Sequence, residues 1–149
     1  MESIYDILIK EHNMVSDLFQ QVLRDNSRET LLKIKAALDP HMAGEEKLFY
    51  SELEKKEELS ELVSHAVEEH DEARSIMSEL ESMKEGGDKN WTSKIKELKE
   101  SIDHHVEEEE GEVFEKAQKV ISQKKAEEIA QQYLEFKKSF KQETPASMH

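Results

Sequence analysis

The 149-residue sequence predicts an all-α protein: an up-down-up-down four-helix bundle with an additional short C-terminal helix. Glycine and proline are rare, with four and two residues, whereas the helix-favouring residues Glu, Lys, Leu and Ala are abundant. Apolar residues recur at three- and four-residue steps almost throughout, as is typical of amphipathic helices. The turn signals between these stretches are short, so neighbouring helices should be antiparallel.

The first two helices are expected to form one antiparallel pair. Ser3 and Asp6 resemble a capping box, with Asp in place of the usual Glu or Gln. The first helix should end near residue 24, because Asp25-Asn26-Ser27 indicates a turn followed by a helix N-cap. The second helix should extend from about residue 28 to residue 56, and Pro40 within it should cause a kink or a local break.

Two more long helices and one short helix should follow. Ser60 can cap the third helix, and Gly86-Gly87-Asp88 indicates its end. A fourth helix is expected from about Trp91 to Lys119, and Ser122 can cap the fifth. The chain should therefore have three parts: the bundle of residues 1–120, an accessory helix of residues 121–141 packed on the bundle, and a flexible tail of residues 142–149.

Charge and hydropathy exclude several classes of protein. The chain has 21 Lys and Arg against 35 Asp and Glu, a formal net charge of −14. Nucleic-acid binders need a basic surface, so we expect no nucleic-acid partner. No apolar run approaches the roughly 18 residues of a membrane span, and the acidic start Met1–Asp6 does not resemble a signal peptide. The expected location is cytoplasmic. The absence of cysteine excludes thiolate metal sites and disulfides.

One histidine interrupts the apolar stripe of each long helix. His12, His41, His70 and His105 each lie three or four residues from an apolar stripe residue. A single histidine of this kind is typical of a hydrogen-bonded core residue, but four on four helices would together need many buried partners. A shared metal removes this difficulty, because neutral imidazole is the commonest metal-binding side chain.

Two of these histidines are followed by a glutamate one turn later. Glu45 follows His41 by four residues and Glu109 follows His105 by four, so each pair shares one helix face. The same spacing occurs in two pairs whose histidines should face solvent: His65/Glu69 and His104/Glu108. The inward histidines make Glu45 and Glu109 the favoured carboxylates.

The sequence also repeats itself. Glu11-His12-Asn13 matches Glu69-His70-Asp71, and His41-x-x-x-Glu45-Glu46 resembles His105-x-x-x-Glu109-Glu110. Two helical hairpins related by a pseudo-twofold axis would each supply one His and one His-Glu pair, which suits a two-metal site on the axis. Glu11 and Glu69 should either orient an imidazole or lie on the surface. Tyr50 should pack in the core, although it could also reach a bound peroxide.

These motifs, His12, His41-x-x-x-Glu45, His70 and His105-x-x-x-Glu109, make residues 1–120 resemble a hemerythrin-like (HHE cation-binding) domain. The resemblance implies a four-helix bundle whose core holds a non-haem centre of two iron ions with an oxo or hydroxo bridge. It further implies the following ligands: His12 and His41 on one iron, His70 and His105 on the other, and Glu45 and Glu109 as bridges.

The resemblance to the invertebrate oxygen carriers of that family is incomplete. Those proteins have a further histidine one turn from the third-helix ligand, where this chain offers Ala66 or Arg74. They have an Asp where this chain has Glu110, so Glu110 is an alternative to Glu109 as the bridge. The missing histidine argues against reversible oxygen carriage.

A coordination count indicates what such a centre could bind. Two six-coordinate irons present about 12 positions, of which the four imidazoles, two bridging carboxylates and an oxo bridge fill about ten. The remaining positions can take dioxygen, peroxide or nitric oxide, which favours oxygen or peroxide handling, including peroxide reduction. No separate catalytic residue is expected. Imidazole and carboxylate ligands also suit manganese or zinc.

Other functions fit the sequence as well. The chain could bind iron or another divalent metal without redox chemistry, or sense iron or redox state through the C-terminal helix. It could instead be a metal-free helical interaction module that docks a protein partner with Tyr133, Phe136 and Phe140. A haem bundle would leave two inward histidines unused. The Glu-x-x-His motif of ferritin-type sites and the His-Glu-x-x-His motif of zinc proteases are absent.

Overall fold

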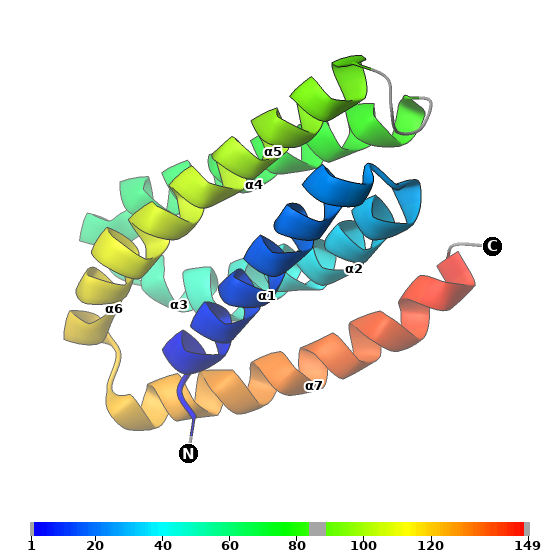
Figure 1. Cartoon of the computed structure of the whole chain (residues 1–149). Helices are drawn as coiled ribbons and strands as arrows, with labels where there is room; N and C mark the ends of the chain where they lie inside the picture. Colours follow the sequence, from blue (N-terminus) through cyan, green and yellow to red (C-terminus); the bar gives the residue numbers. More distant parts are fainter. Residues whose placement is uncertain (1, 84–88, 148–149) are drawn as a thin grey trace.

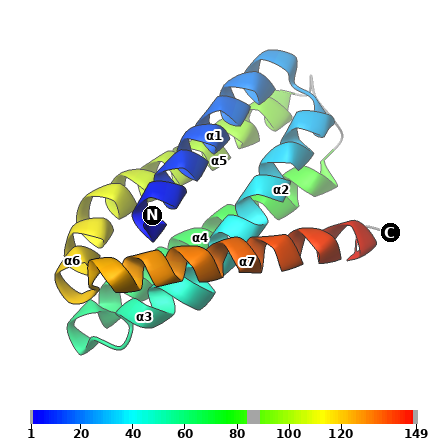
Figure 2. The same ribbon diagram turned by 90° about the horizontal axis from the view of Figure 1, so that it is seen from below.

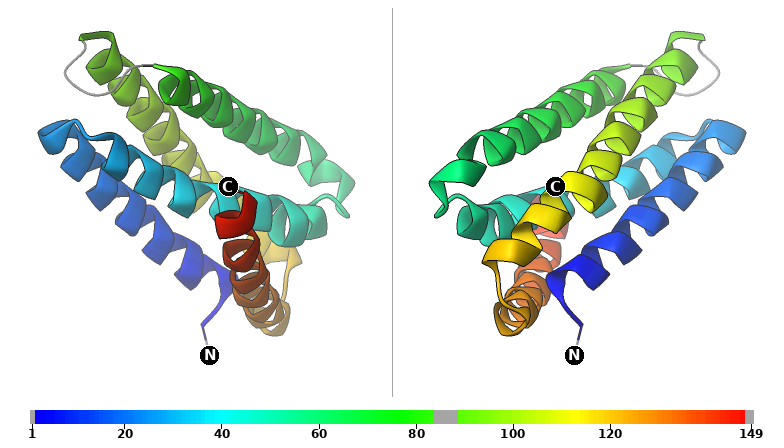
Figure 3. Two further views of the ribbon diagram at one scale, coloured as in Figure 1. Left: turned by 90° about the vertical axis from the view of Figure 1, so that its right-hand side faces the viewer. Right: turned by 90° about the vertical axis from the view of Figure 1, so that its left-hand side faces the viewer.

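The computed structural model describes residues 2–83 and 89–147, and all regular secondary structure within these ranges is helical, as predicted (Figure 1). Four long helices form the bundle: α1 (Ile4–Asp25), α2 (Arg28–Gly44), α4 (Ser60–Ser82) and α5 (Lys89–Glu108). α1 packs along α2, and α4 packs along α5, so the bundle consists of two antiparallel hairpins (Figure 3). Within these ranges, every helix is too short or too polar to span a membrane.

Helices α2 and α5 each continue into a wider, π-helical turn. The additional segments are η1 (Glu45–Tyr50) and α3 (Ser51–Leu53) after α2, and η3 (Glu109–Val113) and α6 (Phe114–Val120) after α5. A short 3₁₀ turn, η2 (Glu57–Leu59), precedes α4. The two π-helical turns occupy equivalent positions in the two hairpins, and each begins at one of the glutamates singled out by the sequence.

The π-helical turn in the second helix keeps a row of side chains facing the core. His41, Glu45 and Phe49 are spaced by four residues, and all three are buried. In a regular α-helix each four-residue step rotates about 40° around the axis, so this row would drift away from the core. A wider turn offsets the drift. Such turns are frequent at functional sites.

The predicted helix starts at Ser3 and Ser27 are confirmed. Asp6 N donates to Ser3 Oγ at 3.4 Å, and Ser3 N donates to Asp6 Oδ2 at 3.1 Å, which completes the capping box. Thr30 N donates to Ser27 Oγ at 3.1 Å. Between the two helices, Asn26 adopts a left-handed conformation with φ of 50°, which lets the chain reverse within two residues.

Several expected boundaries differ from the structure. α2 continues through Pro40 without a break, and the irregularity comes five residues later at η1. Ser60 is the first residue of α4, whose cap position is Leu59, because the preceding 3₁₀ turn leads directly into the helix. α4 ends at Ser82, and the expected stop signal at 86–88 lies outside the described residues.

The C-terminal helix α7 (Gln123–Ser147) is longer than expected, since it extends beyond residue 141. Lys125 N donates to Ser122 Oγ at 3.1 Å, in agreement with the predicted cap. α7 packs on α1, α2 and η1, and crosses the bundle at the end where α1 begins (Figure 2). Tyr133 of α7 is completely buried. The aromatic face of the helix therefore begins with a residue that packs on the bundle.

The apolar core has two parts, one toward each end of the bundle. One cluster includes Leu8, Phe49 and Phe114, and the other includes Phe19, Leu31 and Trp91. Each of the four inward histidines lies on its helix between residues of the two clusters. The histidines therefore form a polar layer within an otherwise apolar interior.

Candidate metal centre

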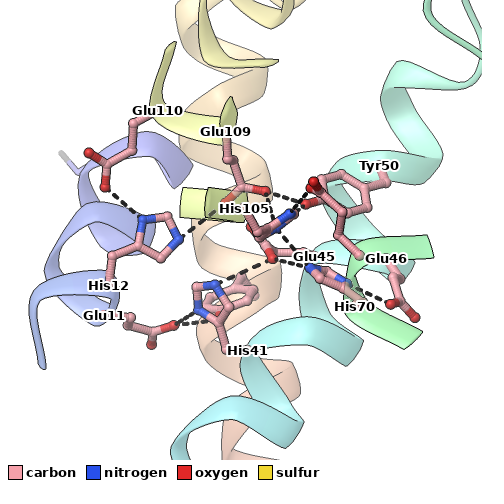
Figure 4. A network of polar contacts seen from close by, with 12 residues as sticks. Glu11, His12, His41, Glu45, Glu46, Tyr50, His70, His105, Glu109 and Glu110 are labelled. Atoms are coloured by element: carbon pink, nitrogen blue, oxygen red, sulfur yellow. Dashed lines mark hydrogen bonds and ion pairs between the residues drawn. The ribbon is translucent and has the colours of Figure 1, made fainter. Parts of the chain in front are cut away.

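Six side chains from the four long helices and the two π-helical turns meet in the polar layer of the bundle (Figure 4). Each histidine directs its Nε2 atom toward the same interior point, and the carboxylates of Glu45 and Glu109 lie among the rings. The group is His12, His41, Glu45, His70, His105 and Glu109. These are the residues that the sequence singled out, and the fold brings all of them together.

Each carboxylate lies between one histidine of one hairpin and one of the other. Glu45 Oε1 is 3.3 Å from His41 Nε2 and 3.1 Å from His70 Nε2. Glu109 Oε1 is 3.1 Å from His12 Nε2, and its Oε2 is 3.4 Å from His105 Nε2. Both glutamates thus occupy the central position that two neighbouring cations would share.

The spacing of these atoms fits small metal ions. Cis ligands at about 2.1 Å from an ion, a typical metal–imidazole bond length, lie about 3.0 Å apart. The nitrogen–oxygen distances of 3.1–3.4 Å are close to this value. The potential ligand atoms of this centre form two sets, and within each set all atoms lie within 4.8 Å of one another. One set comes from His12, His41, Glu45 and Glu109, and the other comes from Glu45, His70 and His105. Glu45 belongs to both sets.

Burial leaves several of these atoms without adequate hydrogen bonds. Glu45 and Glu109 are 0 % exposed, and the four histidines are buried as well. Among the described residues, His12 Nε2, both oxygens of Glu45 and Glu109 Oε1 find no hydrogen-bond partner of good geometry. An unpaired buried carboxylate is costly, whereas a bound cation would satisfy all four atoms. The residues present therefore fit a metal pair.

The outer nitrogen, Nδ1, of each of these four histidines donates to a glutamate. His12 Nδ1 contacts Glu110 and His70 Nδ1 contacts Glu46, both at 2.7 Å. In the same way, His41 Nδ1 contacts Glu11 at 2.8 Å and His105 Nδ1 contacts Glu69 at 2.7 Å. A carboxylate in this position fixes the ring's orientation and tautomer so that Nε2 is free to bind a metal.

These outer contacts follow the pseudo-twofold repeat of the sequence. The contact from His12 to Glu110 corresponds to that from His70 to Glu46, and the contact from His41 to Glu11 corresponds to that from His105 to Glu69. Glu11 and Glu69 thus have the orienting role. Glu110 lies on the outer side of His12 and Glu109 on the inner side, so the geometry favours Glu109 over Glu110 as the shared carboxylate.

Neighbouring carboxylates raise the pKa of two of these histidines, His41 and His105. Burial alone would lower the pKa of His41, but Glu45 and Glu11 outweigh this effect and raise it to about 10. Burial also opposes protonation of His105, whose pKa is raised to about 10 chiefly by Glu109. Without metal, these rings would be imidazolium ions that balance the carboxylate charge. A bound cation can replace those protons.

Tyr50 makes the two halves of the centre different. Its hydroxyl donates to Glu109 and lies 3.3 Å from His105 Nε2, and its ring stacks on His70 with centroids 5.5 Å apart. The equivalent residue in the repeat is Phe114, which has no hydroxyl. Tyr50 therefore does more than pack in the core. It places one proton donor on one side of the centre.

α7 contributes contacts to the centre that the sequence did not reveal. Tyr133 Oη and Lys137 Nζ both donate to Glu11, the glutamate that holds His41. Burial alone would raise the pKa of Glu11, but His41, Lys137 and Tyr133 together lower it to about 2. More than 120 residues separate Glu11 from Tyr133, so only the tertiary fold shows this link.

A small cavity adjoins the rings of the histidines. It has a volume of about 20 Å³. The four inward histidines and Glu69 line one part of it, and five apolar side chains line the rest: Val15, Leu38, Met42, Ile102 and Val106. A space of this size holds about one water-sized molecule. The centre therefore has a small cavity beside it whose remaining lining is mainly apolar.

These features define a helical bundle with an interior histidine–carboxylate centre. Residues 3–117 match the hemerythrin HHE cation-binding domain, and the chain belongs to this family. A protein described as an uncharacterized hemerythrin-like protein of the fission yeast Schizosaccharomyces pombe is 28 % identical over 116 residues. The match covers 74 % of this chain and 57 % of the relative's length. No solved structure matches the chain.

Proposed function

We propose that this protein holds two iron ions between its hairpins and binds dioxygen, peroxide or nitric oxide beside them. His12 and His41 would bind one iron, and His70 and His105 the other. Glu45 and Glu109 would bridge the two ions. The arrangement of each carboxylate between histidines of different hairpins supports this assignment. Manganese or zinc would fit the same donors.

The single observation that carries the choice of ligand is the apolar cavity of about 20 Å³ at the histidine rings. Apart from the four histidines and Glu69, its lining is apolar and includes Leu38, Ile102 and Val106, which offer no hydrogen bond to a polar substrate. A diatomic molecule fits this space, whereas an organic substrate does not. An iron pair would supply the electrons and the open coordination positions for such a ligand.

The protein's own residues would control protons and water at the ligand. Tyr50 Oη holds a proton within hydrogen-bond reach of Glu109 and His105. Burial and the charges of Glu109 and Glu45 raise its pKa well above the usual value, so the hydroxyl stays protonated at neutral pH. Tyr50 does not line the cavity, so it would supply a proton from the Glu109 side of the iron pair.

The proposal is tested by stopped-flow mixing of the reduced, iron-loaded protein with oxygen, hydrogen peroxide and nitric oxide. Val106→Leu adds one methylene to the cavity wall and should slow the reaction with these ligands while iron content stays unchanged. Val120→Leu is the matched control, because Val120 packs in the other apolar cluster, away from the cavity. A reduced protein that reacts with none of the three ligands would refute the proposal. So would a colourless protein that keeps its fold in chelator.

A second candidate function is sensing of iron or redox state through α7. The contacts of Tyr133 and Lys137 with Glu11 connect this helix to His41, so metal binding can alter how α7 is held. In that case the segment 120–149 should be cleaved by protease faster in the metal-free protein. Identical digestion with and without iron would argue against sensing.

A further inference from the structure

A second cluster of histidines and glutamates lies on the outer face of α4 and α5. His65 and Glu69 are one turn apart on α4, and His104 and Glu108 are one turn apart on α5. Because the two helices pack antiparallel, the four side chains converge. The sequence predicted that both histidines face solvent, and their side chains are 53 % and 65 % exposed. The buried centre uses neither of them.

Potential ligand atoms of His65, Glu69 and Glu108, one from each, lie within 4.8 Å of one another, and His104 is next to this set. His65 Nε2 is 3.2 Å from both Glu69 Oε2 and Glu108 Oε2. His104 Nε2 is 3.5 Å from Glu69 Oε2 and 2.6 Å from Glu108 Oε1. Zinc bonds of about 2.0–2.1 Å place tetrahedral ligand atoms about 3.3 Å apart. His104 approaches Glu108 through the other carboxylate oxygen, so the His104 side chain, which is 65 % exposed, would have to shift to become the fourth ligand.

The charges of the cluster also favour a cation. With neutral histidines, Glu69 and Glu108 bring two negative charges together, and no Lys or Arg within the described ranges forms an ion pair with either. The hollow beside Glu69 and His104 is lined by further acidic residues, Glu72, Glu97 and Glu100. A divalent ion would neutralise the pair, and the acidic hollow would raise its local concentration.

We propose that His65, Glu69, His104 and Glu108 form a second metal site, which takes a divalent transition ion such as Zn²⁺. Two imidazoles and two carboxylates are ligands that this ion accepts in four-coordinate sites. His–Glu ion pairs at the surface contribute little to the stability of a fold. Stability alone therefore does not account for the meeting of these four side chains.

Glu69 connects this surface site to the buried centre. Its Oε2 faces His65 and His104, while its Oε1 accepts the Nδ1 hydrogen of His105 at 2.7 Å. A metal ion on the surface would therefore share a carboxylate with a histidine of the centre. Metal on the surface site should influence the orientation and basicity of His105.

The test is a calorimetric titration of the purified, iron-loaded protein with Zn²⁺ alone. The wild type should bind one more Zn²⁺ per chain than the His65→Ala/His104→Ala double variant. Glu108→Gln should weaken this binding about tenfold or more, because it removes a ligand oxygen. Glu100→Gln is the matched control, since it removes the same charge from α5 but no proposed ligand, and its affinity should change by no more than about twofold.

The comparison does not depend on what occupies the buried centre, because the double variant should bind one equivalent fewer in every case. A Zn²⁺-dependent shift of the His65 and His104 ring resonances in the wild type should accompany binding. Equal Zn²⁺ stoichiometry in the wild type and the double variant would overturn the proposal. Equal weakening by Glu108→Gln and Glu100→Gln would show a diffuse charge effect and would overturn it too.

Discussion

Gly44 lies at the closest approach of α7 to the helix that carries His41 and Glu45. A Cβ atom at Gly44 would lie 2.5 Å from Tyr133 Cε1, 2.8 Å from Tyr133 Cδ1 and 3.3 Å from Phe136 Cδ2. The backbone at Gly44 is ordinary α-helix, with φ of −65° and ψ of −41°. Glycine is therefore required here for space and not for its conformation. Gly44→Ala should push α7 away from the bundle.

The size of the effect follows from two opposing terms. To reach an ordinary contact of 3.4 Å, the ring of Tyr133 must retreat by about 0.9 Å, although it is completely buried and hydrogen-bonded to Glu11. Overpacking of this kind costs about 1–3 kcal/mol. The gain in helix propensity from Gly to Ala offsets about 1 kcal/mol. The net loss of unfolding free energy should be about 0–2 kcal/mol, and Glu11 should lose part of its support.

Gly111→Ala isolates the steric term. Gly111 is exposed in η3, and a Cβ atom there would meet nothing within 4 Å. Gly111→Ala should therefore show the gain in helix propensity without any steric cost. Urea unfolding of both variants, in the same metal state, should place Gly44→Ala about 1–3 kcal/mol below Gly111→Ala. If the two variants are equally stable, the close packing of α7 on Gly44 is refuted.

Three further predictions concern the buried centre. His41→Ala should lose about one iron per chain and lower the melting temperature, because metal binding stabilises the folded state, whereas His104→Ala should keep its iron; equal iron loss would contradict the assignment. In the metal-free protein, the pKa values of His41 and His105 are raised to about 10. Their protonation therefore stabilises the fold fully below about pH 6.5 and is lost as the pH rises toward 10, so chelated protein should unfold in less urea at pH 9.5 than at pH 6.5. An unchanged or higher urea midpoint at pH 9.5 would show that these protons do not stabilise the fold. Tyr133→Phe removes a donor to Glu11 and should speed iron loss to a chelator about tenfold, with little change in unfolding free energy. An unchanged rate of iron loss would show that the contact from α7 does not affect how the centre retains its metal.

The inward-facing ligand candidates could be predicted from the sequence because each disturbs a local pattern. His12 and His70 interrupt apolar stripes of 3.6-residue period, and burial on one face is a property of the helix itself. Glu45 and Glu109 follow from the four-residue spacing within their own helices. For these residues, the helix period and the bundle fold were sufficient to bring them together.

Other features depend on tertiary contacts and could not be predicted. Tyr133 and Lys137 reach Glu11 only because α7 crosses α1 and α2, and no spacing within the sequence encodes that crossing. The choice between Glu109 and Glu110 required the positions of both relative to His12. The π-helical turns were also missed, since Glu45–Tyr50 contains no helix-breaking residue and the wider turn arises from keeping several side chains in the core.

The most direct test of the two-iron centre is an anomalous-difference map from crystals of the purified protein, recorded at the iron absorption edge. Two strong peaks are expected in the polar layer, one beside His12 and His41 and the other beside His70 and His105, with the carboxylates of Glu45 and Glu109 between them. A map with no peak in this layer, or with a single peak away from both carboxylates, would contradict the two-iron centre.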